Sequence, residues 1–495
     1  MQIGDLIRRA GRQYGDAPAL IDGERVVSFA EFDELTDRLG NALLARGLAP
    51  GDRVAVLLPN GIDGVVAYYA LAKSGLVRVP LNARETAREL AFKIEDSQAR
   101  ALIHAGEAPA PTEIAITAEE LPGLIESAPA EPCDVRREPD APLRLAYTGG
   151  TTGKPKAVVL TTASELAEVA NFLVDLLPNL HPGSVMLHAA PITHGSGAFF
   201  LPHLVKGAAN VVLPKFSPAA FLEAACEYRA TATFMVPTMI AMLLEDPATA
   251  NADLALERIC YGGAPIATTV LSRGIQLLGP VFAQLYGQAE APLAITCLQP
   301  WEHTPERLTA AGKPYTFVEV QVRDTDGKVL GPGEVGEVLT RGPHTMSRYW
   351  RRPEATAATI EADGWLHTGD IGRWDDEGYL HRPPGDAAHG RRRGGRGLPA
   401  RADGHAVAEG GGPRSGHAVH RPAAMVVAEG SVVAGNGRPP VRRLRVGRRP
   451  LRPLTLGRLD RTVGPTNCSV MFRGVLCWTT IFPPRPLALA NCTSG

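Results

Sequence analysis

The sequence comprises 495 residues with a formal net charge of −1 and 45% hydrophobic residues. A chain of this length and content can bury a substantial core and exceeds one ordinary domain, so two or three domains are expected. No run of about eighteen apolar residues is present and residues 1–16 lack the apolar core of a secretory signal, so we expect a cytoplasmic protein without an integral membrane segment.

The seven cysteines are scattered along the chain and include no CxxC pair. Disulfide frameworks and structural zinc sites need cysteines at characteristic spacings, so this pattern argues against both. Reduced, mostly buried thiols are therefore expected at Cys133, Cys226, Cys260, Cys297, Cys468, Cys477 and Cys492.

Between about residues 50 and 290, apolar strand-like runs alternate with helical periodicity, the pattern of parallel sheets flanked by helices. Strands are predicted at 53–58, 77–80, 101–104, 185–190, 210–213, 232–236, 258–261 and 281–286. Amphipathic helices are predicted at 62–73, 84–96, 218–228 and 269–278. Eight parallel strands rarely stay in one open sheet, so we expect an α/β fold of two doubly wound sheets.

From about residue 312 the pattern changes to alternating strands joined by turns. The segment FVEVQVRDTDGKVL carries an Asp-Gly hairpin signal at Asp326 and Gly327, and GEVGEVLTRG follows it. A small β-barrel or antiparallel sheet is therefore expected over about residues 310–380, as the last part of a domain that spans residues 1–380.

The final segment, residues 381–495, has a different composition. It contains 19 Arg, no Lys and 5 acidic residues, about +14 in charge, while residues 1–380 carry about −15. Its 18 Gly and 13 Pro, with little periodicity, favour a disordered basic tail. A GC-rich gene that is translated in a shifted reading frame gives a sequence of this composition, so we infer a frameshift near codon 381. A genuine, divergent tail is the alternative.

The segment LRLAYTGGTTGKPKAVVLT, residues 143–161, is the strongest local signal. Two β-rich runs flank a loop whose backbone amides, hydroxyls and ammonium groups can converge on a phosphate. It is not a Walker A loop, because Thr148 and Pro155 stand where that motif needs Gly and Ser or Thr. On composition alone, a surface hairpin rich in turn residues remains the alternative.

The string TGGTTGKPKAVVLT resembles the phosphate-binding signature of the adenylate-forming enzymes, the superfamily of acyl-CoA synthetases, luciferases and peptide-synthetase adenylation domains. Five further motifs follow in that family's order: PITHGSG (191–197), YGGAPI (261–266), YGQAE (286–290), GEVGEVLTRGP (333–343) and GWLHTGDIGRWDDEGYL (364–380). The resemblance covers residues 1–380 and implies the family's N-terminal domain of two sheets plus a small barrel.

The resemblance implies a role for each motif. Glu290 is similar to the family's Mg²⁺ carboxylate, Tyr286 to the residue that stacks on adenine, and Asp370 to the acceptor of the ribose hydroxyls. The loop would surround the β- and γ-phosphates of ATP with Thr148, Gly149, Gly150, Thr151, Thr152, Gly153, Lys154 and Lys156, of which Lys154 is assigned a catalytic role. The rest of the ATP site would comprise Gly262, Gly263, Ala264, Gly287 and Gln288.

His194 of PITHGSG corresponds to a family position near the substrate carboxylate and the pocket entrance, so it is a candidate catalytic residue. A His in a small-residue loop can also be a satisfied polar group, and both interpretations stay open. The following pair, Phe199 and Phe200, could line an acyl pocket, but core packing is the more common fate of such residues.

Two departures from the family pattern stand out. Ala289 replaces the Thr that usually precedes the metal-binding Glu, which removes one hydroxyl contact worth about 1 kcal/mol. After Leu380 the family's Asp-Arg-x-x-Lys hinge and its C-terminal domain with a late catalytic Lys are not recognisable, and the last lysine in the chain is Lys328.

The resemblance implies an acid–CoA ligase that uses MgATP to convert a carboxylic acid to an acyl-adenylate and then transfers the acyl group to CoA. A fatty acid is the leading substrate, with aryl and alicyclic acids left open. The alternative is a catalytically impaired nucleotide-binding remnant of such a ligase. Nucleic acid is not an expected partner, because the basic tail lacks interleaved aromatic residues and any known module.

Overall fold

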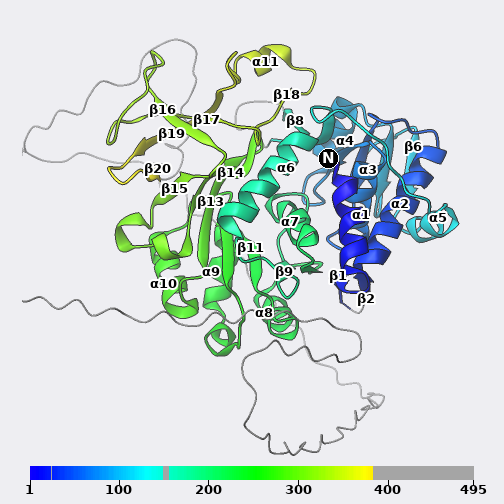
Figure 1. The fold of residues 1–495 in the computed structure, drawn as a ribbon, viewed down its shortest axis with the longest axis horizontal. Helices are drawn as coiled ribbons and strands as arrows, with labels where there is room; N and C mark the ends of the chain where they lie inside the picture. The colour runs from blue at the N-terminus through cyan, green and yellow to red at the C-terminus, as the bar shows by residue number, and fades with distance from the viewer. Residues whose placement is uncertain (24, 149–154, 383–495) are drawn as a thin grey trace, which may run out of the picture. The chain divides into compact units, whose positions relative to one another are not determined.

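The computed structural model describes residues 1–23, 25–148 and 155–382. The strands of these residues form two sheets (Figure 1). All described residues belong to one compact unit. The predicted tail lies outside the described residues from residue 383 onward, so its predicted disorder and origin stay predictions.

The smaller sheet has seven strands and carries the phosphate-loop motif. Its order is β18 (Arg348–Tyr349), β8 (Ala157–Thr161), β7 (Pro142–Tyr147), β4 (Val77–Pro80), β3 (Arg53–Leu57), β5 (Ala101–His104) and β6 (Ile114–Thr117). The strands from β7 to β6 pair in parallel, whereas β8 and β18 are antiparallel additions at one edge.

The larger sheet has thirteen strands and contains most of the other motifs. Its order is β16 (Glu319–Arg323), β17 (Gly336–Arg341), β19 (Leu366–Trp374), β20 (Leu380–His381), β15 (Ala310–Pro314), β14 (Ala291–Leu298), β13 (Phe282–Gln288), β12 (Arg258–Gly262), β11 (Ala232–Met235), β9 (Val185–His188), β10 (Ala209–Val212), β1 (Pro18–Asp22) and β2 (Arg25–Ser28). Neighbours are parallel among six strands of this order, β13, β12, β11, β9, β10 and β1.

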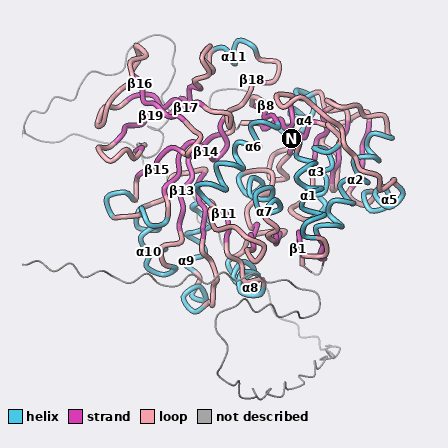
Figure 2. Tube along the Cα trace, viewed as in Figure 1, coloured by secondary structure: helices cyan, strands magenta, loops and turns pink. Residues whose placement is uncertain are grey.

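Eleven α-helices connect or cover these strands in the described residues (Figure 2). They are α1 (Ile3–Tyr14), α2 (Phe29–Ala45), α3 (Ile62–Lys73), α4 (Ala87–Ser97), α5 (Leu121–Ser127), α6 (Thr162–Asn171), α7 (Phe200–Val205), α8 (Pro218–Glu227), α9 (Pro237–Glu245), α10 (Thr268–Leu278) and α11 (Pro353–Ala357). The predicted alternation of strands and helices between residues 50 and 290 is therefore confirmed, with boundaries shifted by a few residues at most.

One such shift has a clear cause at α4. The hydroxyl of Thr86 accepts a hydrogen bond from the Glu89 amide at 3.3 Å, and the Glu89 carboxylate accepts one from the Thr86 amide at 2.8 Å. This reciprocal capping box satisfies backbone donors that have no partner within the helix. The helix therefore begins at Ala87, three residues after the predicted start.

Of the two expectations for residues 310–380, the antiparallel sheet is confirmed and the small β-barrel is not, because these strands extend the larger sheet. Within the described residues, β16 is an outer strand that pairs with β17, and β17 pairs in turn with β19, so the strands do not close into a barrel. The Asp-Gly turn is present, with Gly327 at φ 83° and Arg323 bridged to Val329. The alternation of apolar and polar residues thus predicted the strands correctly, but it did not predict whether these strands close into a barrel.

One apolar core joins the two sheets. Helix α1 buries Ile3, Leu6, Ile7 and Ala10, the i, i+3, i+4, i+7 face of an amphipathic helix. This face contacts α2 and α3 of the smaller sheet and α7 of the larger one. The face was not identified from the sequence, and it helps to hold the two sheets together.

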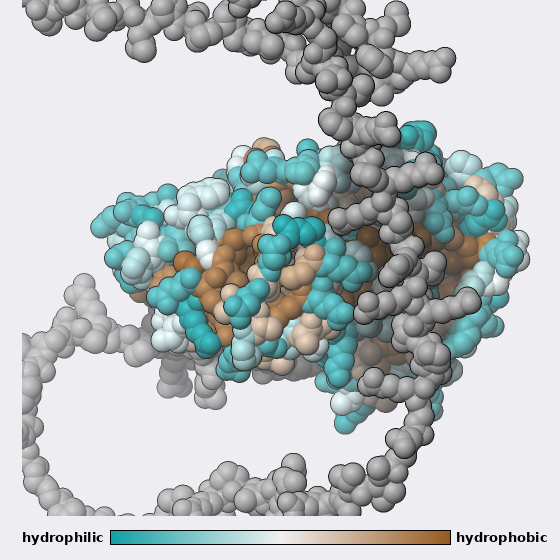
Figure 3. Space-filling model, turned by 90° about the horizontal axis from the view of Figure 1, so that it is seen from below, coloured by the Kyte–Doolittle hydropathy of each residue, from teal (hydrophilic) through white to brown (hydrophobic). Residues whose placement is uncertain are grey.

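The surface mixes polar and apolar side chains, and apolar areas are visible in the view from below (Figure 3). The large apolar side chains that are exposed in the described residues come from widely separated segments and include Val174, Met242, Trp301, Phe317 and Val335. Scattered exposure of this kind is normal and does not define a docking surface. The helices of the described residues include none of sufficient length and apolar character to span a bilayer.

Candidate active site

The predicted phosphate loop joins two antiparallel strands. β7 and β8 pair with Tyr147 opposite Ala157, and the amide of Thr148 donates to the carbonyl of Lys156 at 3.1 Å. The two ends of the loop are therefore adjacent. Of the residues predicted to contact phosphate, Thr148 and Lys156 are described, whereas six lie outside the described residues: Gly149, Gly150, Thr151, Thr152, Gly153 and Lys154.

Tyr349 connects two predicted site residues that are far apart in the sequence. Its hydroxyl donates to Oε1 of Glu290 at 2.6 Å, and the ammonium of Lys156 lies 4.4 Å from the centre of its ring. Burial and the neighbouring carboxylate both raise the pKa of Tyr349, so its hydroxyl keeps its proton at neutral pH. Tyr349 was not predicted, because a lone Tyr in a two-residue strand carries no motif.

The surroundings of Glu290 are compatible with a magnesium ion. The residue lies in the turn between β13 and β14, and the Met346 amide donates to its carbonyl at 2.8 Å. Among the described residues no hydrogen bond occupies Oε2, which leaves one carboxylate oxygen for a cation. The described residues contain no cluster of three potential ligands, and Mg²⁺ commonly takes one or two carboxylates together with substrate phosphates.

Tyr286 and Asp370 come together from β13 and β19. The Tyr286 hydroxyl donates to Oδ2 of Asp370 at 2.8 Å, although 84 residues separate them in the sequence. Arg382 also reaches this pair, with Nη2 at 3.0 Å from Oδ1 of Asp370 and its guanidinium carbon 4.4 Å from the centre of the Tyr286 ring. The predicted adenine and ribose residues are therefore neighbours, and an arginine lies against both.

Two different structural features explain the glycines of the predicted nucleotide wall. A Cβ on Gly262 would lie 2.5 Å from the carbonyl oxygen of Leu285 in the neighbouring strand, so the close pairing of β12 with β13 requires this glycine. Gly263 has φ +80° and open space where its Cβ would be. It precedes Ala264, so this turn presents an uncovered backbone surface.

The end of β13 also requires a glycine. A Cβ on Gly287 would lie 2.3 Å from the backbone nitrogen of Leu293 in β14, and Gln288 is the last residue of β13. The YGQAE motif therefore forms a tight hairpin that presents Tyr286 and Glu290 four residues apart on one short segment. Ala289 lies in the turn of this hairpin, where the family usually has Thr, and it is partly buried against a cluster that includes Met346 and Tyr349.

His194 is an exposed residue in a loop whose other residues are buried or half-buried, and the buried His188 contacts this loop. Nε2 of His194 is 2.9 Å from Nδ2 of Asn82, and the atoms packed around the ring lower its pKa below the usual value. In the same loop, the Ser196 hydroxyl lies 2.9 Å from Nδ1 of His188, whose burial lowers its pKa to about 3. His188 stacks on Phe200 with ring centroids 3.8 Å apart, so it stays neutral and holds the loop in place.

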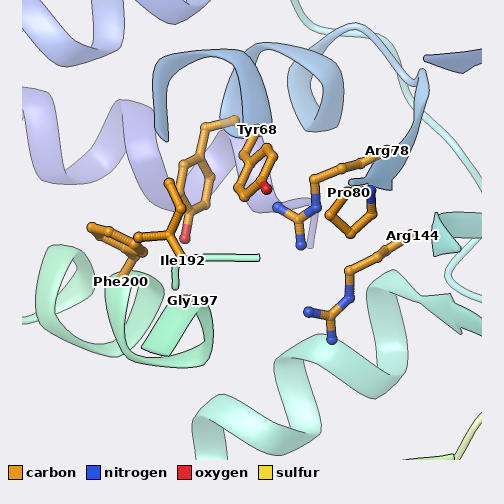
Figure 4. Close-up of a pocket in the computed structure, with 8 residues that line it drawn as sticks. Tyr68, Arg78, Pro80, Arg144, Ile192, Gly197 and Phe200 are labelled. Carbon is orange, nitrogen blue, oxygen red and sulfur yellow. The ribbon is translucent and has the colours of Figure 1, made fainter. Parts of the chain in front are cut away.

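The Phe199–Phe200 pair is buried in the core. Phe199 packs against Phe172 and Phe234, with ring centroids 5.1 and 5.7 Å apart. Phe200 also lines a small cavity behind the PITHGSG loop, together with Tyr68, Tyr69, Arg78, Pro80, Arg144, Ile192 and Gly197 (Figure 4). Core packing is therefore confirmed for both residues, and Phe200 in addition borders the cavity.

Arginines from two paired strands dominate the polar side of this cavity. Figure 4 shows Arg78 of β4 and Arg144 of β7 extending toward the side on which Ile192 lies. Their counter-charge comes from Glu165 of α6, which lies 3.6 Å from Arg78 and 3.8 Å from Arg144. Burial would raise the pKa of Glu165, but the two arginines outweigh this effect and hold it below its usual value.

Comparisons with known proteins match these observations. The family model described as AMP-binding enzyme matches residues 7–350. The chain is 37% identical to a feruloyl-CoA synthase from an Amycolatopsis species over 386 residues, 77% of each sequence. It is 42% identical to the medium/long-chain-fatty-acid–CoA ligase FadD8 of Mycobacterium tuberculosis over 244 residues, 49% of this chain and 42% of that protein.

A solved structure is similar over the whole of its length. The inhibitor-bound N-terminal domain of FACL13 from Mycobacterium tuberculosis superposes with a TM-score of 0.72 at 27% identity, covering 77% of this chain and 99% of that domain. Fold, motif order and family match all agree. This chain therefore belongs to the AMP-binding enzyme family, within its acyl- and aryl-CoA ligases.

Proposed function

We propose that this protein is an ATP-dependent acid–CoA ligase that acts on a fatty acid. The observation that carries this proposal is that one hairpin brings two carboxylates into the site: Asp370 contacts Tyr286 of β13, and Glu290, which Tyr349 holds, lies in the turn between β13 and β14. A carboxylate can accept hydrogen bonds from the hydroxyls of a nucleoside, and a second carboxylate can hold the metal ion of its phosphate chain.

The proposed reaction has two steps. A carboxylate oxygen of the acid attacks the α-phosphorus of ATP, the bond to pyrophosphate breaks, and an acyl-adenylate forms. The sulfur of CoA then attacks the acyl carbon, the bond to AMP breaks, and the thioester and AMP are released. Mg²⁺ held by Glu290 and phosphate would neutralise charge on the phosphate oxygens. The chain's main contribution in the first step is positioning and charge stabilisation.

The proposed assignments follow the motifs. Tyr286 stacks on adenine beside the backbone of Gly262, Gly263 and Ala264, Asp370 accepts hydrogen bonds from the ribose, and Lys154 and Lys156 neutralise phosphate charge. His194 lies at the entrance for the acid, where its lowered pKa favours a neutral imidazole at pH 7. A cytoplasmic location is proposed because ATP and CoA are the co-substrates.

We propose residues 1–380 as the AMP-binding domain and residues 381–495 as a tail that differs from the family's C-terminal domain. This arrangement favours a second candidate function, a nucleotide-binding remnant with impaired catalysis. The specific observation is that no lysine follows Lys328, whereas the resembled family has a catalytic lysine near its C-terminus. Loss of one preorganised cationic donor typically costs about 100-fold to 1000-fold in rate.

One experiment separates ligase from remnant. The 495-residue chain is incubated with MgATP, CoA and either decanoate or ferulate, and mass spectrometry detects the acyl-adenylate and the CoA thioester. Thioester from decanoate in excess over ferulate supports the fatty-acid ligase, and a preference for ferulate supports an aryl-acid ligase instead. ATP binding by calorimetry without either product supports the remnant. Failure to bind ATP at all would contradict both candidates.

A further inference from the structure

Arg382 is the last described residue, and the strand before it belongs to the larger sheet. It directly follows β20, where His381 pairs with Ala310 of β15 and with Arg373 of β19. It also lies just beyond Leu380, the point after which the sequence no longer follows the family pattern. The position of Arg382 is therefore constrained by the sheet through its neighbour His381.

The side chain of Arg382 contacts both residues that the proposed function assigns to adenosine, Tyr286 and Asp370. Its Nη2 pairs with Oδ1 of Asp370 at 3.0 Å, and its guanidinium lies 4.4 Å from the centre of the Tyr286 ring. Because the Tyr286 hydroxyl donates to Oδ2, both oxygens of Asp370 are engaged. With this arrangement, only 4% of Tyr286 and 6% of Asp370 remain exposed.

A nucleoside needs the surfaces that are covered here. Stacking of adenine requires an open face of the Tyr286 ring, and recognition of the ribose requires a free oxygen of Asp370. The remaining exposure of these two side chains leaves room for neither contact. The side chain of Arg382 is 25% exposed, and its buried Nε has no hydrogen-bond partner among the described residues, so a movement of this side chain toward solvent breaks no hydrogen bond at Nε.

We infer that Arg382 acts as an intramolecular competitor of the nucleotide, with its guanidinium taking the place of the adenine and ribose. This inference rests on the proposed nucleotide site. A nucleotide binds only after the arginine leaves Tyr286 and Asp370, so the measured affinity is the intrinsic affinity reduced by the fraction of molecules in which the site is open.

Adenosine is the probe that tests this competition, because it has no phosphate that Arg382 could attract. Calorimetry on the full-length chain compares the wild type with Arg382→Ala and Arg382→Gln, the second of which retains part of the side-chain stem. Both variants should bind adenosine about tenfold more tightly, the gain expected when a cation–π contact and an ion pair no longer compete. Arg382→Lys retains the charge without the planar guanidinium and should give a smaller gain.

The matched control is Arg373→Ala, which removes an exposed arginine from the neighbouring position of β19 and should leave the affinity unchanged. Equal or weaker adenosine binding by Arg382→Ala and Arg382→Gln, with the folds intact by circular dichroism, would overturn the competition. Asp370→Asn then distinguishes the nucleotide site from the competition by Arg382. If it weakens adenosine binding, the nucleotide site stands without the competitor; if it has no effect in either background, the site itself is wrong and the competition with it.

Discussion

At the scale of single residues, Tyr349 decides how Glu290 can act. The short hydrogen bond to Oε1 fixes the direction of the carboxylate, and the aromatic ring receives the ammonium of Lys156. One side chain therefore connects the proposed metal ligand with the end of the phosphate loop. A carboxylate held in this way presents its other oxygen in a constant direction, which suits the strict geometry that Mg²⁺ requires.

Replacement of Glu290 by Gln should weaken Mg²⁺-dependent ATP binding. The substitution exchanges an anionic ligand for a neutral oxygen and conserves the shape of the side chain. Calorimetric titration of ATP with and without Mg²⁺ measures the effect, and circular dichroism verifies the fold. An unchanged affinity for MgATP would refute the proposed role of this carboxylate.

Tyr349→Phe should reduce the gain in ATP affinity that Mg²⁺ provides by about tenfold, while ATP binding without Mg²⁺ changes little. The variant retains the ring that contacts Lys156 and loses only the hydrogen bond to the carboxylate, an interaction of about 1.5 kcal/mol for a charged acceptor. Tyr14→Phe is the control, because that hydroxyl donates a long hydrogen bond to the Val205 carbonyl, at 3.4 Å, and Val205 is not a residue of the proposed site. If both variants behave alike, Tyr349 does not position the metal ligand.

At the scale of secondary-structure elements, α6 inserts two carboxylates beside the arginines of β4 and β7. Glu165 pairs with Arg78 and Arg144, but Oε1 of the neighbouring Glu168 has no hydrogen-bond partner among the described residues. Burial, which Arg144 offsets only partly, raises the pKa of Glu168 to about 8. The helix therefore carries one ionised and one protonated carboxyl group at pH 7.

Glu168→Gln should stabilise the protein relative to the wild type as the pH rises from 6 to 8. The folded state retains the Glu168 proton up to about pH 8, whereas the unfolded chain releases it near 4.5, so the unfolded state binds fewer protons across this interval. Wild-type stability then falls with rising pH, by on the order of 2 kcal/mol between pH 6 and 8, and the Gln variant lacks this loss.

Urea unfolding at pH 6, 7 and 8 tests this sign, with Glu223→Gln on the exposed face of α8 as the control. The control should follow the wild type at every pH. A stability difference between Glu168→Gln and the wild type that does not grow with pH would show that Glu168 is ionised in the folded protein.

At the scale of the whole described structure, Asn60 links the two sheets. It lies in the loop between β3 and α3 of the smaller sheet, and its Nδ2 donates to the carbonyls of Ala190 and Leu213 at 3.0 and 3.2 Å. Its Oδ1 accepts from the Ile192 amide at 3.0 Å. These three backbone groups belong to segments that follow β9 and β10, so one side chain connects the loops of both sheets and supports the PITHGSG segment.

Asn60→Ala should lower the free energy of unfolding by about 2–3 kcal/mol, because three partly buried backbone groups lose their partner. Asn41→Ala, which removes hydrogen bonds to the carbonyls of Pro129 and Glu131 at an exposed position, should cost less than about 1 kcal/mol. Thermal unfolding of the two variants measures the difference. Equal losses would mean that Asn60 does not stabilise the junction more than a surface contact does.

The sequence by itself determined the strands and helices between residues 50 and 290 and the order of the motifs. Parallel strands that are buried on both faces form continuous apolar runs, and such runs are visible without knowledge of their partners. The loop composition at 148–156 and the carboxylates at 290 and 370 were likewise visible, because each belongs to a short motif that can be recognised without its spatial neighbours.

Only the tertiary structure decided which strands pair and which side chains meet. β1 and β2 join the larger sheet although the smaller sheet follows them in sequence, and β15, β16, β17, β19 and β20 extend that sheet instead of closing a barrel. Tyr349 reaches Glu290 across 59 positions, and Arg382, which follows β20, reaches Tyr286 of β13 although β15 and β14 lie between these two strands. Periodicity reports whether a segment has a buried face, but the partner of that face is chosen by long-range packing, which no local pattern contains.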